Sequence, residues 1–237
     1  GYYAINNNDL WEVGTGFGSN LTSAVVITPT PGAVLTADSL ALVAVHNGLN
    51  GTTGWDLTEP VSTWNGVLVM NKRVIRLVLN TSVYTTYRGV IAPEIGQLSA
   101  LQKLDLLGQF DGNFPSTISQ LTELRELTIS AGEGTLKVVL PENIGNLGKL
   151  EVLSIPFVIE GGIPASFGNL TQLRKVNFLN GRLTGAIPPG IGNLTQLEEL
   201  NLQGNDLSGN LPSTLSGMQQ LRNLYLAENQ LSGEIPS

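Results

Sequence analysis

The chain has 237 residues, and 12 Lys and Arg against 19 Asp and Glu give it a net charge of −7. A nucleic-acid interface needs clustered basic side chains, and no basic run exceeds two residues, so nucleic acid is not expected as a partner. The absence of cysteine excludes a disulfide framework, Cys-ligated zinc and a cysteine nucleophile. No stretch approaches the roughly 20 consecutive apolar residues of a membrane-spanning helix, so no membrane span is expected.

The first segment, residues 1–35, is rich in Gly, Asn and Thr and contains one apolar run typical of a strand, at residues 24–27. We predict that it forms a linker or a small β extension. It carries no secretion signal of the charged-then-apolar kind, so any such peptide is expected to have been removed already.

Residues 36–73 are predicted to form an amino-terminal cap, made of one helix and short strands. The run from Asp38 to Val45 predicts the helix, with Asp38 as its capping residue. The one histidine, His46, lies at the helix end and is expected to be structural. Since no nucleophile elbow or phosphate-binding loop is present, we expect a protein that is not an enzyme and binds no cofactor or metal.

Residues 74–237 contain a repeat, in which an apolar residue is followed two positions later by another. The copies begin at Leu77, Leu104, Leu127, Leu153, Val176, Leu200 and Leu224. A spacing of 23 to 27 residues is typical of a solenoid. The alternation predicts short strands whose leucines face inward, paired in a parallel sheet. The expected fold is therefore an α/β solenoid of about seven repeats behind a helical cap.

The segment from Leu197 to Pro212 fits the pattern L-x-x-L-x-L-x-x-N-x-L, and residues 161–170 and 185–194 fit G-x-I-P-x-x-[IF]-G-x-L. These motifs resemble plant-type leucine-rich repeats, also found in bacterial surface proteins. The resemblance implies a right-handed superhelix with a concave sheet, and a receptor-like, inhibitory or adhesive role. The cap around Trp64 also resembles the plant cap, but Ser62 and Val69 stand where it has cysteines. Packing of Trp64 and Trp55 is expected to hold the cap instead, and a microbial relative is favoured.

The predicted partner-binding surface consists of outward strand positions and the adjoining loops, where Tyr and Arg are typical interface anchors. Its candidate residues are Tyr84, Tyr87, Arg88, Lys103, Asp105, Leu107, Glu126, Phe157, Lys175, Leu179 and Tyr225. We expect binding in the amino-terminal half, and we expect Leu107, Phe157 and Leu179 to lie near one apolar edge.

The sequence predicts a secreted or cell-surface binding module for a protein ligand. Two alternatives stay open at this point: a carbohydrate-binding or adhesion solenoid, and a structural spacer of a larger surface protein. No closing cap follows the last repeat, whose leucine layer starts at Leu224. Self-association through this layer is a further expectation.

Overall fold

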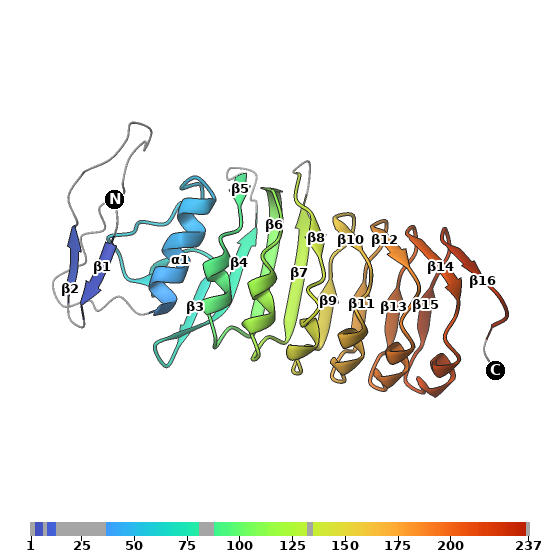
Figure 1. Ribbon diagram of the computed structural model, residues 1–237. Helices are drawn as coiled ribbons and strands as arrows, with labels where there is room; N and C mark the ends of the chain where they lie inside the picture. Colours follow the sequence, from blue (N-terminus) through green and yellow to red (C-terminus); the bar gives the residue numbers. More distant parts are fainter. Residues whose placement is uncertain (1–2, 7–8, 13–36, 81–87, 132–134, 236–237) are drawn as a thin grey trace.

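The protein is a stack of coils that begins with a helical cap (Figure 1). The computed structural model describes residues 3–6, 9–12, 37–80, 88–131 and 135–235. Strands β1 (Tyr3–Asn6) and β2 (Asp9–Glu12) form an antiparallel pair before the cap. The strand-like run at residues 24–27 lies outside the described residues.

The coils and the cap together contribute strands to a nine-stranded sheet, called here the long sheet. Its strands are β3 (Val67–Met70), β4 (Arg73–Asn80), β5 (Arg88–Val90), β6 (Lys103–Asp111), β7 (Glu126–Ala131), β9 (Val152–Ser154), β11 (Lys175–Asn177), β13 (Glu199–Asn201) and β15 (Asn223–Tyr225). All pairs except β3 with β4 are parallel, and the repeat positions are in register. The leucines face inward, since Leu104 and Leu153 have no exposed surface, which confirms the solenoid prediction.

A second sheet, which the sequence analysis did not predict, has five parallel strands and is called here the short sheet. Its strands are β8 (Val138–Val139), β10 (Ile159–Gly161), β12 (Arg182–Gly185), β14 (Asp206–Asn210) and β16 (Gln230–Ser232). Each is two to five residues long, too short for a strand pattern to stand out in sequence. The segments become strands because adjacent coils satisfy each other's backbone groups.

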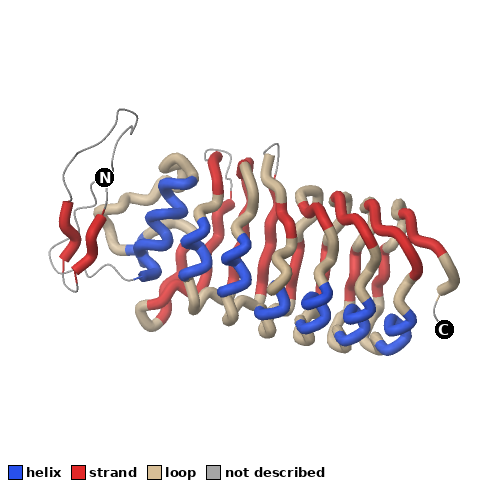
Figure 2. The backbone as a smooth tube through the Cα atoms, viewed as in Figure 1, coloured by secondary structure: helices blue, strands red, loops and turns tan. Residues whose placement is uncertain are grey.

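Short 3-10 helices line up in one row along the stack (Figure 2). They are η2 (Pro93–Gln97), η3 (Ser116–Gln120), η4 (Ile144–Asn146), η5 (Ala165–Asn169), η6 (Pro189–Asn193) and η7 (Ser213–Gly217). A proline precedes several of them and fixes the entry to the turn, as at Pro164 with φ −68°. Here the coils touch closely: a Cβ added at Gly168 would lie 2.5 Å from the Gly190 carbonyl oxygen. The repeated glycine is therefore a packing requirement.

The cap consists of helix α1 (Ala37–Gly48), the 3-10 turn η1 (Val61–Thr63) and strand β3. The expectation that tryptophans hold it is confirmed, because the buried rings of Trp55 and Trp64 stack with centroids 5.0 Å apart. The prediction for Asp38 is wrong in its detail, since α1 begins at Ala37. The Asp38 carboxylate is buried and accepts hydrogen bonds from the Arg73 side chain and the Val74 backbone, so it joins the helix to β4.

Two asparagines after the strands, at the N position of the repeat pattern, join successive coils. Asn205 Nδ2 donates to the carbonyl oxygens of Leu202, at 2.9 Å, and Phe178, at 2.8 Å. Its Oδ1 accepts from the Leu183 backbone at 3.0 Å, and Asn229 repeats this arrangement one coil later. The earlier coils lack this asparagine, and their strands vary in length, from nine residues in β6 to three in β9 and β11.

Candidate binding surface

The outward face of the long sheet is the candidate binding surface, because its side chains are in part exposed while the alternate positions fill the core. The central row of outward residues runs across the strands through Val78, Asp105, Thr128, Ser154, Asn177, Asn201 and Tyr225. The row changes from a carboxylate to hydroxyls, amides and a phenol along the stack. The face therefore offers different chemistry at each coil on a uniform backbone.

In the amino-terminal half, the predicted charged residues neutralise one another. Lys103 lies 3.4 Å from Asp105 and also forms an ion pair with Glu126 on the next strand. The hydrogen bond from Lys103 to Glu126 raises the pKa of this lysine, and the nearby charge of Asp105 adds to the effect. Leu107 is half-buried beside them on β6. These three charges therefore have partners within the chain.

The loop predicted to hold interface anchors lies mostly outside the described residues, which exclude Tyr84 and Tyr87. Arg88 begins β5, where its backbone pairs with that of Gln109. The role of these three residues in binding stays a prediction.

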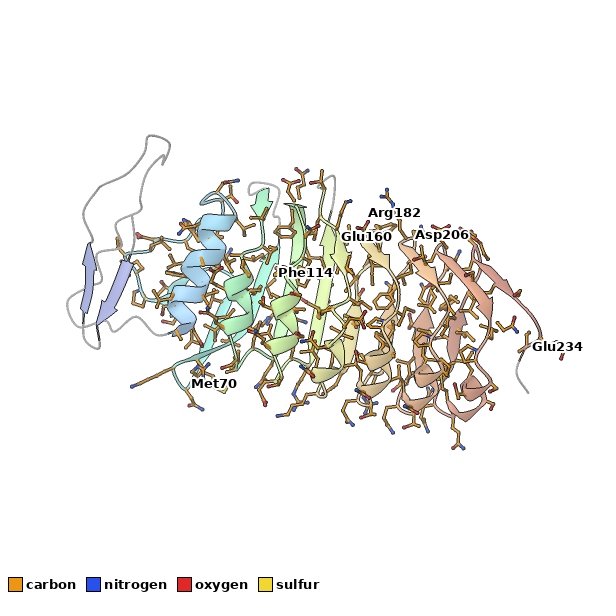
Figure 3. All side chains as sticks on the ribbon, in the orientation of Figure 1. Met70, Phe114, Glu160, Arg182, Asp206 and Glu234 are labelled. Carbon is orange, nitrogen blue, oxygen red and sulfur yellow. The ribbon has the colours of Figure 1, made fainter. Side chains whose placement is uncertain are left out.

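Two exposed apolar residues of β3 extend the surface beyond the predicted set. Leu68 is 48% exposed and Met70 is 56% exposed, and Leu68 lies beside Arg76 in the register of the long sheet. Figure 3 labels Met70 at the lower edge of the molecule, near its amino-terminal end. The sequence did not indicate that these two residues are exposed. Residues 67–70 are all apolar, so no alternation of apolar and polar residues marks the outward side of the strand.

The predicted apolar edge is present at the centre of the stack. Phe157 is 55% exposed, and Pro156 and Leu179 beside it are half-buried. The Phe157 backbone has a φ of +70° and donates a hydrogen bond to the Leu179 carbonyl oxygen at 2.9 Å. An aromatic residue rarely adopts this conformation, so Phe157 is an unusual residue for this turn.

The carboxy-terminal half carries amides and an aromatic ring. Lys175 is exposed on β11, and Tyr225 is 44% exposed on β15. Between them lie Asn177 and Asn201, whose Oδ1 atoms accept hydrogen bonds from backbone groups two residues later. Sequence reasoning named Lys175 and Tyr225 as sites but treated both asparagines only as outward positions.

On another surface of the protein, charged and polar side chains pair with one another. On the short sheet, Lys137 lies 3.9 Å from Glu160, and Gln230 donates to Asp206. Figure 3 shows Glu160, Arg182 and Asp206 on neighbouring strands. The described residues contain no cluster of His, Cys, Asp and Glu that could hold a metal ion. In the same part of the chain, no helix has the length and apolarity needed to cross a membrane.

His46 lies apart from this surface, packed inside the cap. It is 8% exposed, its Nδ1 is 2.5 Å from Thr53 Oγ1, and its ring stacks on Trp55. Burial lowers the pKa of His46 below its usual value. These contacts agree with the structural role expected for this residue.

Comparison with known proteins identifies the fold. A family described as a leucine-rich repeat region matches residues 133–235. Three solved structures are similar: PEPR1-AtPEP1 (TM-score 0.72, 32% identity), the plant peptide hormone receptor RGFR1 in complex with RGF2 (0.62, 37%) and a TDR receptor (0.61, 32%). The matches cover 84%, 68% and 68% of this chain but only 29%, 25% and 27% of the three structures. No curated protein is significantly similar to the chain.

Proposed function

Since the chain is a leucine-rich repeat protein, we propose that it is a non-catalytic module that binds a protein or peptide through the outward face of the long sheet. The similar RGFR1 structure is of a plant peptide hormone receptor solved with RGF2. Another similar structure, 27% identical, is the ectodomain of a plant membrane receptor kinase from Arabidopsis thaliana. These likenesses support a place outside the cell or on its surface.

The observation that carries the proposal is the contrast between the two sides of each strand. From Leu77 to Leu200 the inward positions carry a buried leucine, or valine at Val176, whereas the outward positions change from charged to amide to aromatic. Packing explains the repetition of the core but not the variety on the surface. A rigid sheet with varied, partly exposed side chains is suited to recognising one partner among many.

A second candidate function is glycan binding or adhesion. It is supported by the amides of Asn177 and Asn201 and by the exposed ring of Tyr225, because sugars are bound by amide hydrogen bonds and aromatic stacking. A structural spacer, the third alternative, would bind neither peptides nor glycans.

The proposal is tested by offering the purified chain a random peptide library displayed on phage and, separately, a glycan array. Selected ligands are then measured against two variants that obstruct the face, Thr128→Arg on β7 and Asn201→Arg on β13. Gln196→Arg, which adds the same side chain to an exposed turn after η6, is the control.

We expect peptides to be enriched, and one or both obstructing variants to weaken their binding while Gln196→Arg binds as the wild type does. Enrichment of glycans alone would favour the adhesion alternative. Failure to enrich either class, or equal loss of binding in the control, would contradict the proposed function.

A further inference from the structure

We propose that the long sheet holds a subsite for an extended peptide, formed by two oriented side-chain amides and an apolar rim. The amides belong to Asn177 and Asn201, and the rim is formed by Pro156, Phe157 and Leu179. The subsite belongs to the surface proposed above and depends on that function. It narrows the partner to an extended segment that presents carbonyl groups beside one apolar side chain.

The two amides present hydrogen-bond donors that nothing in the described chain uses. Asn177 Oδ1 accepts from the Leu179 backbone N–H at 3.2 Å, and Asn201 Oδ1 accepts from the Gln203 backbone N–H at 3.1 Å. Only the amide oxygen can accept from an N–H, so each NH2 group is turned away from its own backbone. Among the described residues, none accepts a hydrogen bond from either Nδ2 atom.

The two donors also lie side by side. Asn177 and Asn201 are register partners on adjacent parallel strands, which lie about 4.8 Å apart. Ser154 and Tyr225 continue the same row on either side. Because the side-chain oxygens are already held, a ligand meets the amides in a fixed orientation and loses little entropy in ordering them.

The charge beside the amides favours a neutral acceptor. Lys175 and Glu199 are register partners on the same face and carry opposite charges, and neither forms a short ion pair with a described residue. The electrostatic fields of these two opposite charges partly cancel at the amides, so an anionic ligand would gain little binding energy there. Peptide carbonyl groups are neutral acceptors of the right kind.

The backbone conformation and exposure of Phe157 are the reason we expect the peptide to place an apolar side chain at the rim. The residue at the same position of the following coils also has a positive φ: it is Asn180, Gly204 and Glu228 in turn. Gly and Asn adopt this conformation readily, whereas a bulky aromatic residue does so only at a cost. Phe157 combines a positive φ with 55% exposure, although its backbone N–H is hydrogen-bonded to Leu179. Such a residue is typical of a functional position.

The rim and the amides form one continuous site. Leu179 follows Asn177 by two residues and is hydrogen-bonded to it, and its carbonyl oxygen accepts from Phe157. In an extended peptide, side chains alternate in direction, so one can enter the rim while adjacent carbonyl groups face the amides. A sugar could also use the amides and the ring of Phe157, but the aliphatic Pro156 and Leu179 offer no hydrogen-bond partners to its hydroxyl groups. The observations therefore favour a peptide.

The subsite is tested with a peptide enriched from the random library by the wild-type chain. Phe157→Asn removes the aromatic anchor and places a residue that tolerates the local φ. The double variant Asn177→Asp/Asn201→Asp keeps the oxygens that bond to the backbone and removes both NH2 groups. Asn169→Asp/Asn193→Asp, at exposed ends of η5 and η6, adds the same charge elsewhere and is the matched control.

We expect the enriched peptides to share an apolar residue, and both subsite variants to bind them more than roughly tenfold more weakly, as expected on loss of an interface anchor. Phe157→Asn should melt at the same or a higher temperature than the wild type, which separates lost binding from lost folding. The control should bind within about twofold of the wild type.

Unchanged binding in both subsite variants, together with loss in Thr128→Arg, would overturn the subsite but leave the proposed function standing. Enrichment of no peptide at all would overturn both. A glycan whose binding depends on Phe157 and on both asparagines would show the site to be real and the partner class wrong.

Discussion

Single residues in this solenoid divide sharply into those that hold the coils together and those that face outward. Leu200 is 1% exposed and is stacked in register between Val176 and Leu224 of the adjacent coils, whereas Tyr225, one coil later, is 44% exposed. Because each inward leucine fills a layer shared by two coils, its loss leaves a cavity that neither coil can close alone. The outward residues carry no such shared packing.

Leu200→Ala should therefore lower the free energy of unfolding by roughly 2 to 5 kcal/mol, as for other buried leucines. Tyr225→Ala should change it by about 0.5 kcal/mol or less, in line with substitutions at exposed sites. Urea unfolding of both variants beside the wild type checks the difference. Equal losses would contradict the assignment of the two residues to opposite sides of the sheet.

His46 links stability to pH through the cap. Burial lowers its pKa in the folded protein below the usual 6.5, so below about pH 6.5 the unfolded chain binds more protons than the folded one. The contribution of neutral His46 is therefore complete above that pH and is lost as the pH falls toward its folded-state pKa. Acidification should destabilise the cap, where His46 stacks on Trp55.

The measurement is the melting temperature of the wild type and of His46→Asn between about pH 7 and about pH 5, a range in which ordinary carboxylates stay largely ionised. Asn offers Thr53 a hydrogen-bonding group but does not titrate. We expect the wild type to lose more stability than the variant as the pH falls. Parallel curves would show that His46 makes no contribution.

At the level of elements, the two halves of the stack are built differently. In the last two coils, the three-residue strands β13 and β15 are followed by Asn205 and Asn229, which bridge to carbonyl groups of the same coil and the coil before it. The earlier coils have no asparagine at this position, and their strands range from three residues in β9 to nine in β6, which also pairs with β5. The asparagine bonds therefore add to the backbone pairing between coils, which continues beside them from Leu202 to Tyr225 and from Gly204 to Ala227.

Asn205→Ala should remove these bonds and leave the Leu183 N–H and the Phe178 carbonyl without their partner. Each buried group left unpaired costs about 1 to 3 kcal/mol, so this variant should be among the most destabilising single changes of a polar residue. The free energy of unfolding in urea measures it, with the exposed Asn193→Ala as the control. A loss no larger than that of the control would mean that water satisfies the same groups.

Across the whole molecule, charge and shape point to a binder of specific surfaces rather than of polyanions. The net charge is −7, and four of the acidic side chains are already engaged by Arg125, Lys149, Arg174 and Lys103 between coils. Few basic groups are left to neutralise phosphate or sulfate. The long sheet is the face proposed for recognition.

The chain should accordingly pass through a heparin column at physiological salt without retention, because it lacks a basic patch to release counterions. Elution only at raised salt would contradict this expectation and would point to a basic cluster formed in the loops. A titration with labelled duplex DNA under the same conditions serves as a second readout.

The sequence by itself determined the repeat, the inward leucines and the outward rows, because each follows from a period that local physics imposes. The tryptophan-packed cap followed instead from the resemblance of the region around Trp64 to the plant cap. It did not predict the short sheet, whose two- to five-residue strands exist only because neighbouring coils supply their partners. It also misplaced the role of Asp38, whose carboxylate bonds to residues 35 and 36 positions away.

The tertiary structure decided which outward residues stand out from the rest. The sequence marks Phe157 only as a candidate residue of an apolar edge. Its backbone strain is visible only in the structure, where the coil turns with a positive φ. The amides of Asn177 and Asn201 become a pair only when the register of β11 and β13 brings them together. A repeat can be read from the order of residues along the chain. A binding site depends on distances between residues of different coils, and only the packing of the coils determines those distances.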